Sequence, residues 1–114
     1  MNTDKNPVDI VLAFVNALNE EDFVTAKSFL NTDFVFKGPL ATREGADVYI
    51  QDMEKMRLKY QVDKTFVNDQ EVCLIYKVTI GGISLPTCGL YLLKDQKLSS
   101  LTVFFDPRPA LNSK

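Results

Sequence analysis

Histidine is absent from the 114-residue sequence, and cysteine and glycine are scarce. Without histidine, the chain cannot assemble Ser-His-Asp or Cys-His catalytic machinery or a histidine-based metal site. The two cysteines, Cys73 and Cys88, are too few for a four-thiolate zinc site within one chain. The five glycines form neither the dinucleotide-binding fingerprint nor a P-loop. We therefore expect neither a bound metal nor a cofactor.

Excess positive charge and long apolar runs are also missing. The formal net charge of -2 argues against a nucleic-acid-binding surface. No apolar run approaches the roughly 20 residues that a membrane helix needs. The first residues, Met1–Asn6, lack the apolar stretch of a signal peptide. The sequence therefore predicts a cytoplasmic protein that binds neither nucleic acid nor a membrane.

The chain does contain enough apolar material for a core, because 46% of its residues are hydrophobic. This length suits one domain, which we expect to span residues 1–114 with a core over about 7–106. Apolar residues at helical spacing predict a buried first helix that opens at Asn6-Pro7. A second helix is predicted from Phe23 to about Leu30, behind an acidic cap at residues 20–22, and a third follows Gly45.

The rest of the chain is typical of strands. A short strand is predicted at Phe34–Phe36, and longer ones are predicted at residues 60–67, 71–80, 83–93 and 97–105. Gly81-Gly82 lies between two isoleucines, which is a strong signal for a two-residue hairpin. That hairpin places Tyr76 opposite Thr87, and Leu74 opposite Gly89, on one face of the sheet.

The strand pattern leaves a second, outer face that is also mostly apolar. With a three-residue turn at 94–96, Leu101, Val103 and Phe105 join the inner face, and the outer face holds Cys73, Ile75, Lys77, Cys88, Leu90, Leu92, Leu98, Thr102 and Phe104. Three helices can cover only one face well, so the outer face predicts a homodimer through Ile75, Leu90, Leu92 and Phe104. The alternative is a scatter of ordinary exposed side chains.

Cys73 and Cys88 come out as diagonal neighbours on this outer face, roughly 7 Å apart. That spacing is long for a disulfide. The sequence therefore favours two small buried thiols.

The order of elements, α-α-β-α-β-β-β-β, and several local motifs resemble the nuclear-transport-factor-2-like superfamily, which includes ketosteroid isomerases and SnoaL-like polyketide cyclases. The matching motifs span residues 7–106 and comprise residues 13–19 followed by Glu21-Asp22-Phe23, Phe34–Pro39, Gly45, Lys97–Leu101 and Phe105-Asp106. The resemblance implies an α+β fold: a cone-shaped half-barrel of three helices on a strongly curved, mainly antiparallel sheet, with a pocket between them. It also implies dimers through the outer face of the sheet.

The resemblance to ketosteroid isomerases does not extend to their chemistry. Their tyrosine donor, general-base aspartate and protonated aspartate correspond to Phe14, Gly38 and Gly89 here. None of these residues can supply a base or a donor. SnoaL-like cyclases often use an acid near the end of the last strand, where this chain has Asp106. Pro107-Arg108 follows directly, which favours a local contact between Asp106 and Arg108 instead.

Three functions therefore remain open. The first, which the lack of histidine and of paired acids favours, is the binding of a small apolar or aromatic ligand without catalysis. The second is a cyclase, hydratase or isomerase with Asp106 as base and Tyr76 or Tyr91 as acid. The third is an interaction domain with a vestigial pocket. The residues expected to line the pocket are Phe14, Tyr49, Met53, Leu74, Tyr76, Thr87, Tyr91, Val103 and Phe105.

Overall fold

The computed structural model describes residues 6–108, which form three helices and one six-stranded sheet. The elements in chain order are α1 (Pro7–Asn19), α2 (Phe23–Ser28), β1 (Leu30–Lys37), β2 (Thr42–Glu44), α3 (Ala46–Met56), β3 (Lys59–Asn68), β4 (Glu71–Ile80), β5 (Ile83–Lys94) and β6 (Lys97–Phe104). The strand order in the sheet is β2-β1-β6-β5-β4-β3. All neighbouring strands are antiparallel except β1 and β6, which are parallel. The predicted α+β class is thus confirmed.

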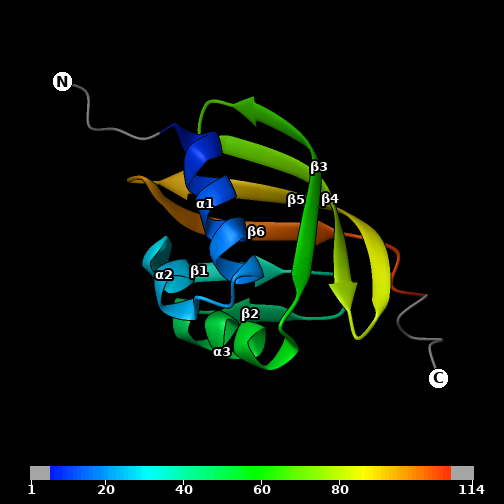
Figure 1. Ribbon diagram of the computed structural model, residues 1–114. Coiled ribbons are helices and arrows are strands. Elements are labelled where there is room, and N and C mark those ends of the chain that lie inside the picture. Colours follow the sequence, from blue (N-terminus) through cyan, green and yellow to red (C-terminus); the bar gives the residue numbers. More distant parts are fainter. Residues whose placement is uncertain (1–5, 109–114) are drawn as a thin grey trace.

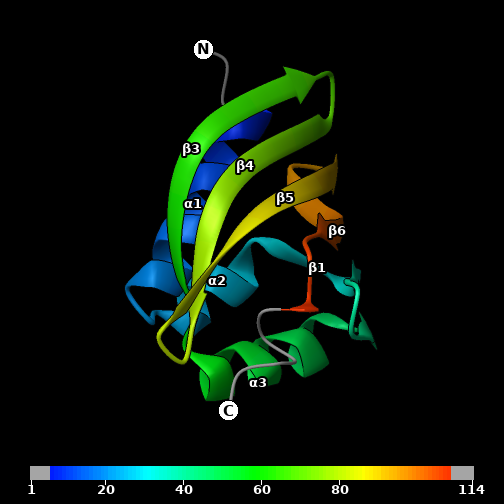
Figure 2. The ribbon, with the colours of Figure 1, turned by 90° about the vertical axis from the view of Figure 1, so that its right-hand side faces the viewer.

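The sheet is open and strongly curved, and the helices lie on its concave side (Figure 1). Figure 2 shows β3, β4 and β5 bending around α1, while α3 lies across the opposite, wider end. An extra residue, Asp63, interrupts the pairing of β3 with β4, because Val62 faces Tyr76 whereas Lys64 faces Ile75. Bulges of this kind bend and twist a strand. The result is the expected cone.

The hairpin between β4 and β5 has the predicted register. Gly81 and Gly82 form the turn with φ values of 54° and 86°, which a glycine adopts without steric cost. Tyr76 pairs with Thr87, and Leu74 pairs with Gly89. The inner face of these two strands is therefore placed as the sequence predicts.

The first half of the sheet differs from the prediction. The second helix ends at Ser28 rather than near Leu30, and β1 begins at Leu30 rather than at Phe34. Leu30 pairs with Leu98 of β6, and its buried side chain holds the start of the strand. The polar residues 31–33 conceal this strand in the sequence. The three-residue strand β2 was not predicted, because it has no apolar pattern and depends on its pairing with β1.

The turn between β5 and β6 also differs from the prediction, and one residue changes face. The turn has two residues, Asp95 and Gln96, because Lys94 pairs with Lys97. An extra residue, Ser99, then enters β6, since Leu93 faces Leu98 whereas Leu92 faces Ser100. The bulge restores the parity, so Leu101 and Val103 are buried on the inner face as predicted. Leu98, however, was predicted on the outer face, and it is fully buried in the core.

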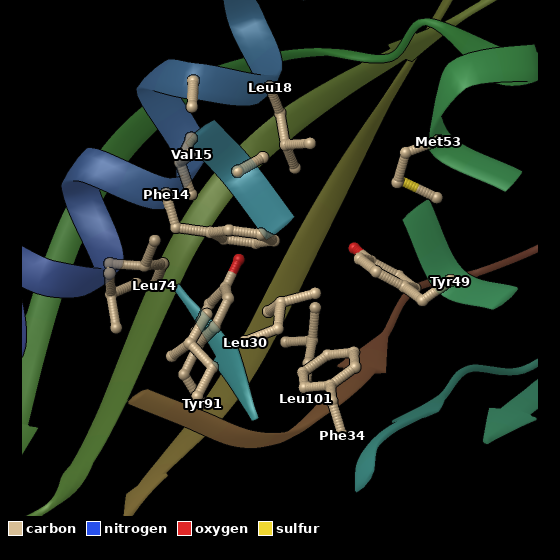
Figure 3. Close-up of a cluster of buried hydrophobic side chains, with 14 of the residues drawn as sticks. Phe14, Val15, Leu18, Leu30, Phe34, Tyr49, Met53, Leu74, Tyr91 and Leu101 are labelled. Atoms are coloured by element: carbon tan, nitrogen blue, oxygen red, sulfur yellow. The ribbon is translucent and has the colours of Figure 1, made fainter. Parts of the chain in front are cut away.

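The core fills the narrow end of the cone beneath α1 (Figure 3). Pro7 occupies the first turn of α1, and the Asn6 side chain caps it by accepting a hydrogen bond from the Val8 N–H at 2.9 Å. The predicted burial of α1 is confirmed, and Phe14 is completely inaccessible to solvent. Figure 3 shows Phe14 meeting Tyr91 from the sheet, with Tyr49 on the side of α3.

Candidate ligand-binding cavity

A cavity of about 310 Å³ opens at the wide end of the cone. Its walls come from the inner face of the sheet, from α3 and from the β1–β2 loop at residues 38–41. Apolar side chains form most of this wall: Phe36, Leu40, Met53, Met56, Leu58, Val78, Ile80, Leu101, Val103 and Phe105. A concave, mainly apolar site with a few polar groups is the usual form of a small-molecule site.

Six of the nine residues expected to line a pocket do lie on the wall of this cavity. They are Tyr49, Met53, Tyr76, Thr87, Val103 and Phe105. The other three, Phe14, Leu74 and Tyr91, lie in the solid core instead. Leu74 and Tyr91 lie on the same face of the sheet as Tyr76 and Thr87 but nearer its narrow end, where α1, which carries Phe14, closes the space. Alternation along a strand predicts the face of a residue but not its depth in the cone.

All four tyrosines of the chain lie in the interior, and three of them, Tyr49, Tyr60 and Tyr76, line this cavity. The rings of Tyr60 and Tyr76 lie 5.4 Å apart between their centroids. The Tyr49 hydroxyl interacts with Tyr60, and the Tyr76 hydroxyl interacts with Tyr91. Burial raises the pKa of each of these hydroxyls well above its usual range. The phenols therefore stay protonated at physiological pH and present neutral hydrogen-bonding groups.

Tyr60 was missed by sequence reasoning, and a long-range contact from α1 positions it. The side chain of Asn19, at the end of α1, accepts a hydrogen bond from the Tyr60 N–H at 2.7 Å. The same amide donates to the Tyr60 carbonyl at 3.0 Å. These two hydrogen bonds, the Asn19 clasp, hold the start of β3 and hence the position of Tyr60 on the cavity wall.

Thr87 contributes the fourth hydroxyl of the cavity wall, beside those of Tyr49, Tyr60 and Tyr76. It is buried, and its O–H donates to the Leu85 carbonyl at 3.1 Å. Its proton is therefore engaged within the strand, while its oxygen retains capacity to accept a hydrogen bond. Thr87 is thus suited to hold a ligand group that donates.

Aromatic rings occupy the space beside both Gly38 and Gly89. A Cβ atom added to Gly89 would lie 3.1 Å from ring carbons of both Tyr76 and Tyr91. A Cβ atom added to Gly38 would lie 3.0 Å from the Phe36 ring. Larger side chains at these positions would have to displace these rings. The interior beside Gly38 and Gly89 is therefore shaped by aromatic packing.

An ion pair that was not predicted from the sequence lies on the cavity wall. The Nε atom of Arg43, on β2, lies 2.6 Å from an Asp52 carboxylate oxygen on α3. The same guanidinium donates from Nη1 to the Thr42 carbonyl at 3.2 Å. Asp52 is the only carboxylate among the described residues on this wall. Its charge is thus compensated by a neighbour from an element that sequence patterning does not reveal.

Asp106 does not line the cavity. Its carboxylate forms a fork with Arg108, with 2.9 Å from Nε to Oδ1 and 2.6 Å from Nη2 to Oδ2. The guanidinium and the Arg108 N–H together lower the pKa of Asp106 to about 2. A carboxylate held so firmly in its ionised form is a weak base. The local Asp-Arg contact favoured by the sequence is therefore present, and it turns Asp106 away from a catalytic setting.

Two further features of the described residues concern metal sites and membrane-spanning helices. Over residues 6–108, no group of three or more acidic, cysteine or histidine side chains is arranged to hold a metal ion. None of the helices in this described range has the length and apolarity that a membrane crossing requires.

Comparison with known proteins gives a family and a fold. The family model of the SnoaL-like domain matches residues 11–101 of the sequence. A crystal structure of an NTF2-like protein of unknown function from Cytophaga hutchinsonii is 46% identical, covers 97% of this chain and 99% of its own, and has a TM-score of 0.94. The sequence matches no curated protein.

More distant structures share the fold alone. An LEH-like epoxide hydrolase from M. tuberculosis is 20% identical, with 93% of this chain and 86% of its own covered and a TM-score of 0.80. A de novo designed protein with a curved β-sheet is 16% identical, with 90% and 86% covered and a TM-score of 0.77. A natural enzyme and a designed scaffold thus adopt the same cone, so the fold by itself does not specify a reaction.

Proposed function

The chain belongs to the SnoaL-like domain family, and from that premise we propose that it binds a small, flat, mainly apolar molecule in the cavity without transforming it. The observation that carries the proposal is the composition of the cavity wall. Apolar side chains surround four neutral hydroxyls, and the only described carboxylate on the wall is paired with Arg43. Such a wall can orient a ligand, but its buried polar groups are neutral hydroxyls and its carboxylate is paired. The remaining charged residue on the wall, Lys55, is exposed to solvent.

The hydroxyls define the ligand more closely. Tyr76 and Thr87 face each other across β4 and β5, so both lie on one patch of the wall. A ligand hydroxyl there can donate to the Thr87 oxygen, and a ligand oxygen can accept from a tyrosine. We therefore expect an aromatic or alicyclic molecule that carries one or two oxygen atoms. Because Phe14, Gly38 and Gly89 carry no donor or base, we expect no turnover in an assay with a ketosteroid substrate.

The test uses two probes that differ by a single oxygen, naphthalene and 2-naphthol, with binding measured by thermal shift and calorimetry. Both should bind the wild type, and 2-naphthol should bind more tightly. Thr87→Val should weaken 2-naphthol about threefold to tenfold, the cost of one net hydrogen bond, while naphthalene should be unaffected.

Thr102→Val is the matched control, because Thr102 is a half-buried threonine on the opposite face of the sheet. It should leave the affinity of both probes unchanged. Failure of either probe to bind would overturn the proposal, and so would an equal loss of 2-naphthol affinity in both threonine variants.

We further propose a homodimer through the outer sheet face. Ile75 and Phe104 are 40% and 57% exposed, and Leu90 and Leu92 are half-buried beside them. A stable interface buries more than about 1,000 Å² in total, so this face must be largely covered in the dimer. Sedimentation should show a dimer at micromolar concentration, and Ile75→Lys should shift it to monomer.

Val67→Lys serves as the control for the dimer, since Val67 is an exposed apolar residue at the far end of β3. Its paired residue Val72 is buried, so Val67 belongs to the other face of the sheet. This variant should remain dimeric. A monomeric wild type would contradict the proposed interface.

We propose a cytoplasmic location for the protein. The chain has only two cysteines, whereas small secreted domains are typically rich in disulfides. Cell fractionation that recovers the protein outside the cytoplasm would contradict this location.

A further inference from the structure

The two cysteines touch each other on the outer face of the sheet. Cys73 on β4 pairs with Leu90, and Cys88 on β5 pairs with Ile75, so the cysteines are diagonal neighbours as predicted. The side chains lean toward each other, and the two Sγ atoms lie 3.2 Å apart. Both residues are free and half-buried. The sulfur atoms are thus much closer than the diagonal spacing of the sheet alone suggests.

We propose that Cys73 and Cys88 form a dithiol site that oxidised glutathione, or another small disulfide, converts to an internal disulfide. A disulfide bond measures about 2.05 Å, so the sulfurs must approach by a little over 1 Å from their contact at 3.2 Å. The two-residue Gly81-Gly82 turn joins β4 directly to β5, so the cysteines belong to one hairpin. Side-chain rotation within this hairpin has to supply the remaining approach of the two sulfurs.

The reaction proceeds by two thiol–disulfide exchanges. One cysteine loses its proton, attacks a sulfur of oxidised glutathione and forms a mixed disulfide, and the first glutathione leaves as a thiolate that takes up a proton. The second cysteine then loses its proton, attacks the protein sulfur of the mixed disulfide and releases the second glutathione. The protein loses two protons and two electrons, and one oxidised glutathione takes them up to become two reduced ones.

The setting of the pair favours closure over retention of glutathione. The second thiol is already in contact with the first, so it reaches the mixed disulfide without diffusion. The neighbours Ile75 and Leu90 are apolar and offer no polar group to hold a bound glutathione. Burial and the adjacent thiol raise the pKa of Cys73 to about 11, so it rests as a thiol at neutral pH. In a reducing compartment the internal disulfide is therefore a transient, reversible state.

The test incubates the fully reduced protein with oxidised glutathione at mildly alkaline pH and follows its intact mass. The wild type should lose two hydrogens without retaining glutathione, and peptide mapping should link Cys73 to Cys88. In Cys73→Ser and in Cys88→Ser, the remaining cysteine has no partner, so the mixed disulfide with one glutathione should accumulate. Treatment with a reductant should restore the starting mass of all three proteins.

The same experiment on Ile75→Lys separates a shielded site from an unreactive one. Ile75 belongs to the face proposed for the dimer, so a dimer could slow the exchange in the wild type. If Ile75→Lys forms the internal disulfide, the site is reactive and the proposal stands. If neither protein closes the bond, or if both accumulate two glutathiones or disulfide-linked dimers, the proposal is overturned.

Discussion

The narrow and wide ends of the cone are made by the same strands, yet one end is solid and the other is hollow. At the narrow end, Phe14 of α1 and Leu74 of β4 belong to one buried cluster, and neither side chain is accessible to solvent. At the wide end, Tyr76 and Thr87 follow on the same face of the same hairpin, but they border a cavity of about 310 Å³. The difference lies in what covers the sheet, not in the sheet itself.

Coverage differs because the two helices meet the sheet differently. The apolar helix α1 buries six side chains and lies along the concave surface. The helix α3 buries four side chains, and its packing partners include β1 and β2 at the edge of the sheet. It therefore covers the wide end but leaves the cavity beneath it open. The pocket is thus the part of the continuous core that α3 borders but does not fill.

The largest loss of stability should come from a cavity made in the solid end. Phe14→Ala should lower the free energy of unfolding by about 3–5 kcal/mol, because it leaves a cavity among side chains that cannot collapse fully. Chemical denaturation measures the loss. Val24→Ala is the control, since Val24 is apolar but 85% exposed on α2, and its effect should be within about 0.5 kcal/mol. A similar loss in both variants would mean that Phe14 does not support the narrow end.

Gly89 lies at the boundary between the solid end and the hollow end, so an alanine there tests how closely the core and the cavity wall are packed. Its Cβ would lie 3.1 Å from the rings of Tyr76 on the cavity side and Tyr91 on the core side. We expect Gly89→Ala to destabilise the fold by about 1 kcal/mol, at the low end of overpacking costs, because Tyr76 can shift into the cavity. That shift should also weaken the binding of 2-naphthol.

A double-mutant cycle isolates this effect. In the background of Tyr76→Leu, part of the crowding is gone, so Gly89→Ala should destabilise less than it does alone. Equal destabilisation in both backgrounds would show that the Tyr76 ring does not set the limit at Gly89.

The solid end was easier to predict from the sequence than the hollow end. The helical spacing in α1 and the alternation in β4 and β5 each identify a buried face, and Gly81-Gly82 sets their register. These signals are local, so they can be detected without a structure. They predict the cone and the inner face, including Tyr76 and Thr87, but they contain no information on where along the strand the helices stop.

The features that sequence reasoning missed depend on contacts between distant segments. The strand β2 exists through its pairing with β1, and it alone brings Arg43 to Asp52. Leu98 lies in the core because the turn before β6 has two residues rather than three, and the bulge at Ser99 then returns Leu101 and Val103 to the same face. Tyr60 reaches the cavity wall through the clasp from Asn19, 41 residues earlier. None of these has a periodic pattern that would reveal it.

The smallest expected effect concerns Asp106, which lies outside both ends of the cone. Its contact with Arg108 is exposed, and exposed ion pairs contribute little to stability. Asp106→Asn should therefore leave the affinity for 2-naphthol unchanged and barely alter unfolding at neutral pH. The lowered pKa means that its small contribution is present at neutral pH and is lost as the pH falls from about 4 toward 2. An NMR titration of the Asp106 carboxyl should give a midpoint near 2, and Arg108→Gln should raise it toward the ordinary value near 3.8. A midpoint well above 4 in the wild type, or a loss of ligand binding in Asp106→Asn, would instead bring Asp106 into the site and favour an enzyme.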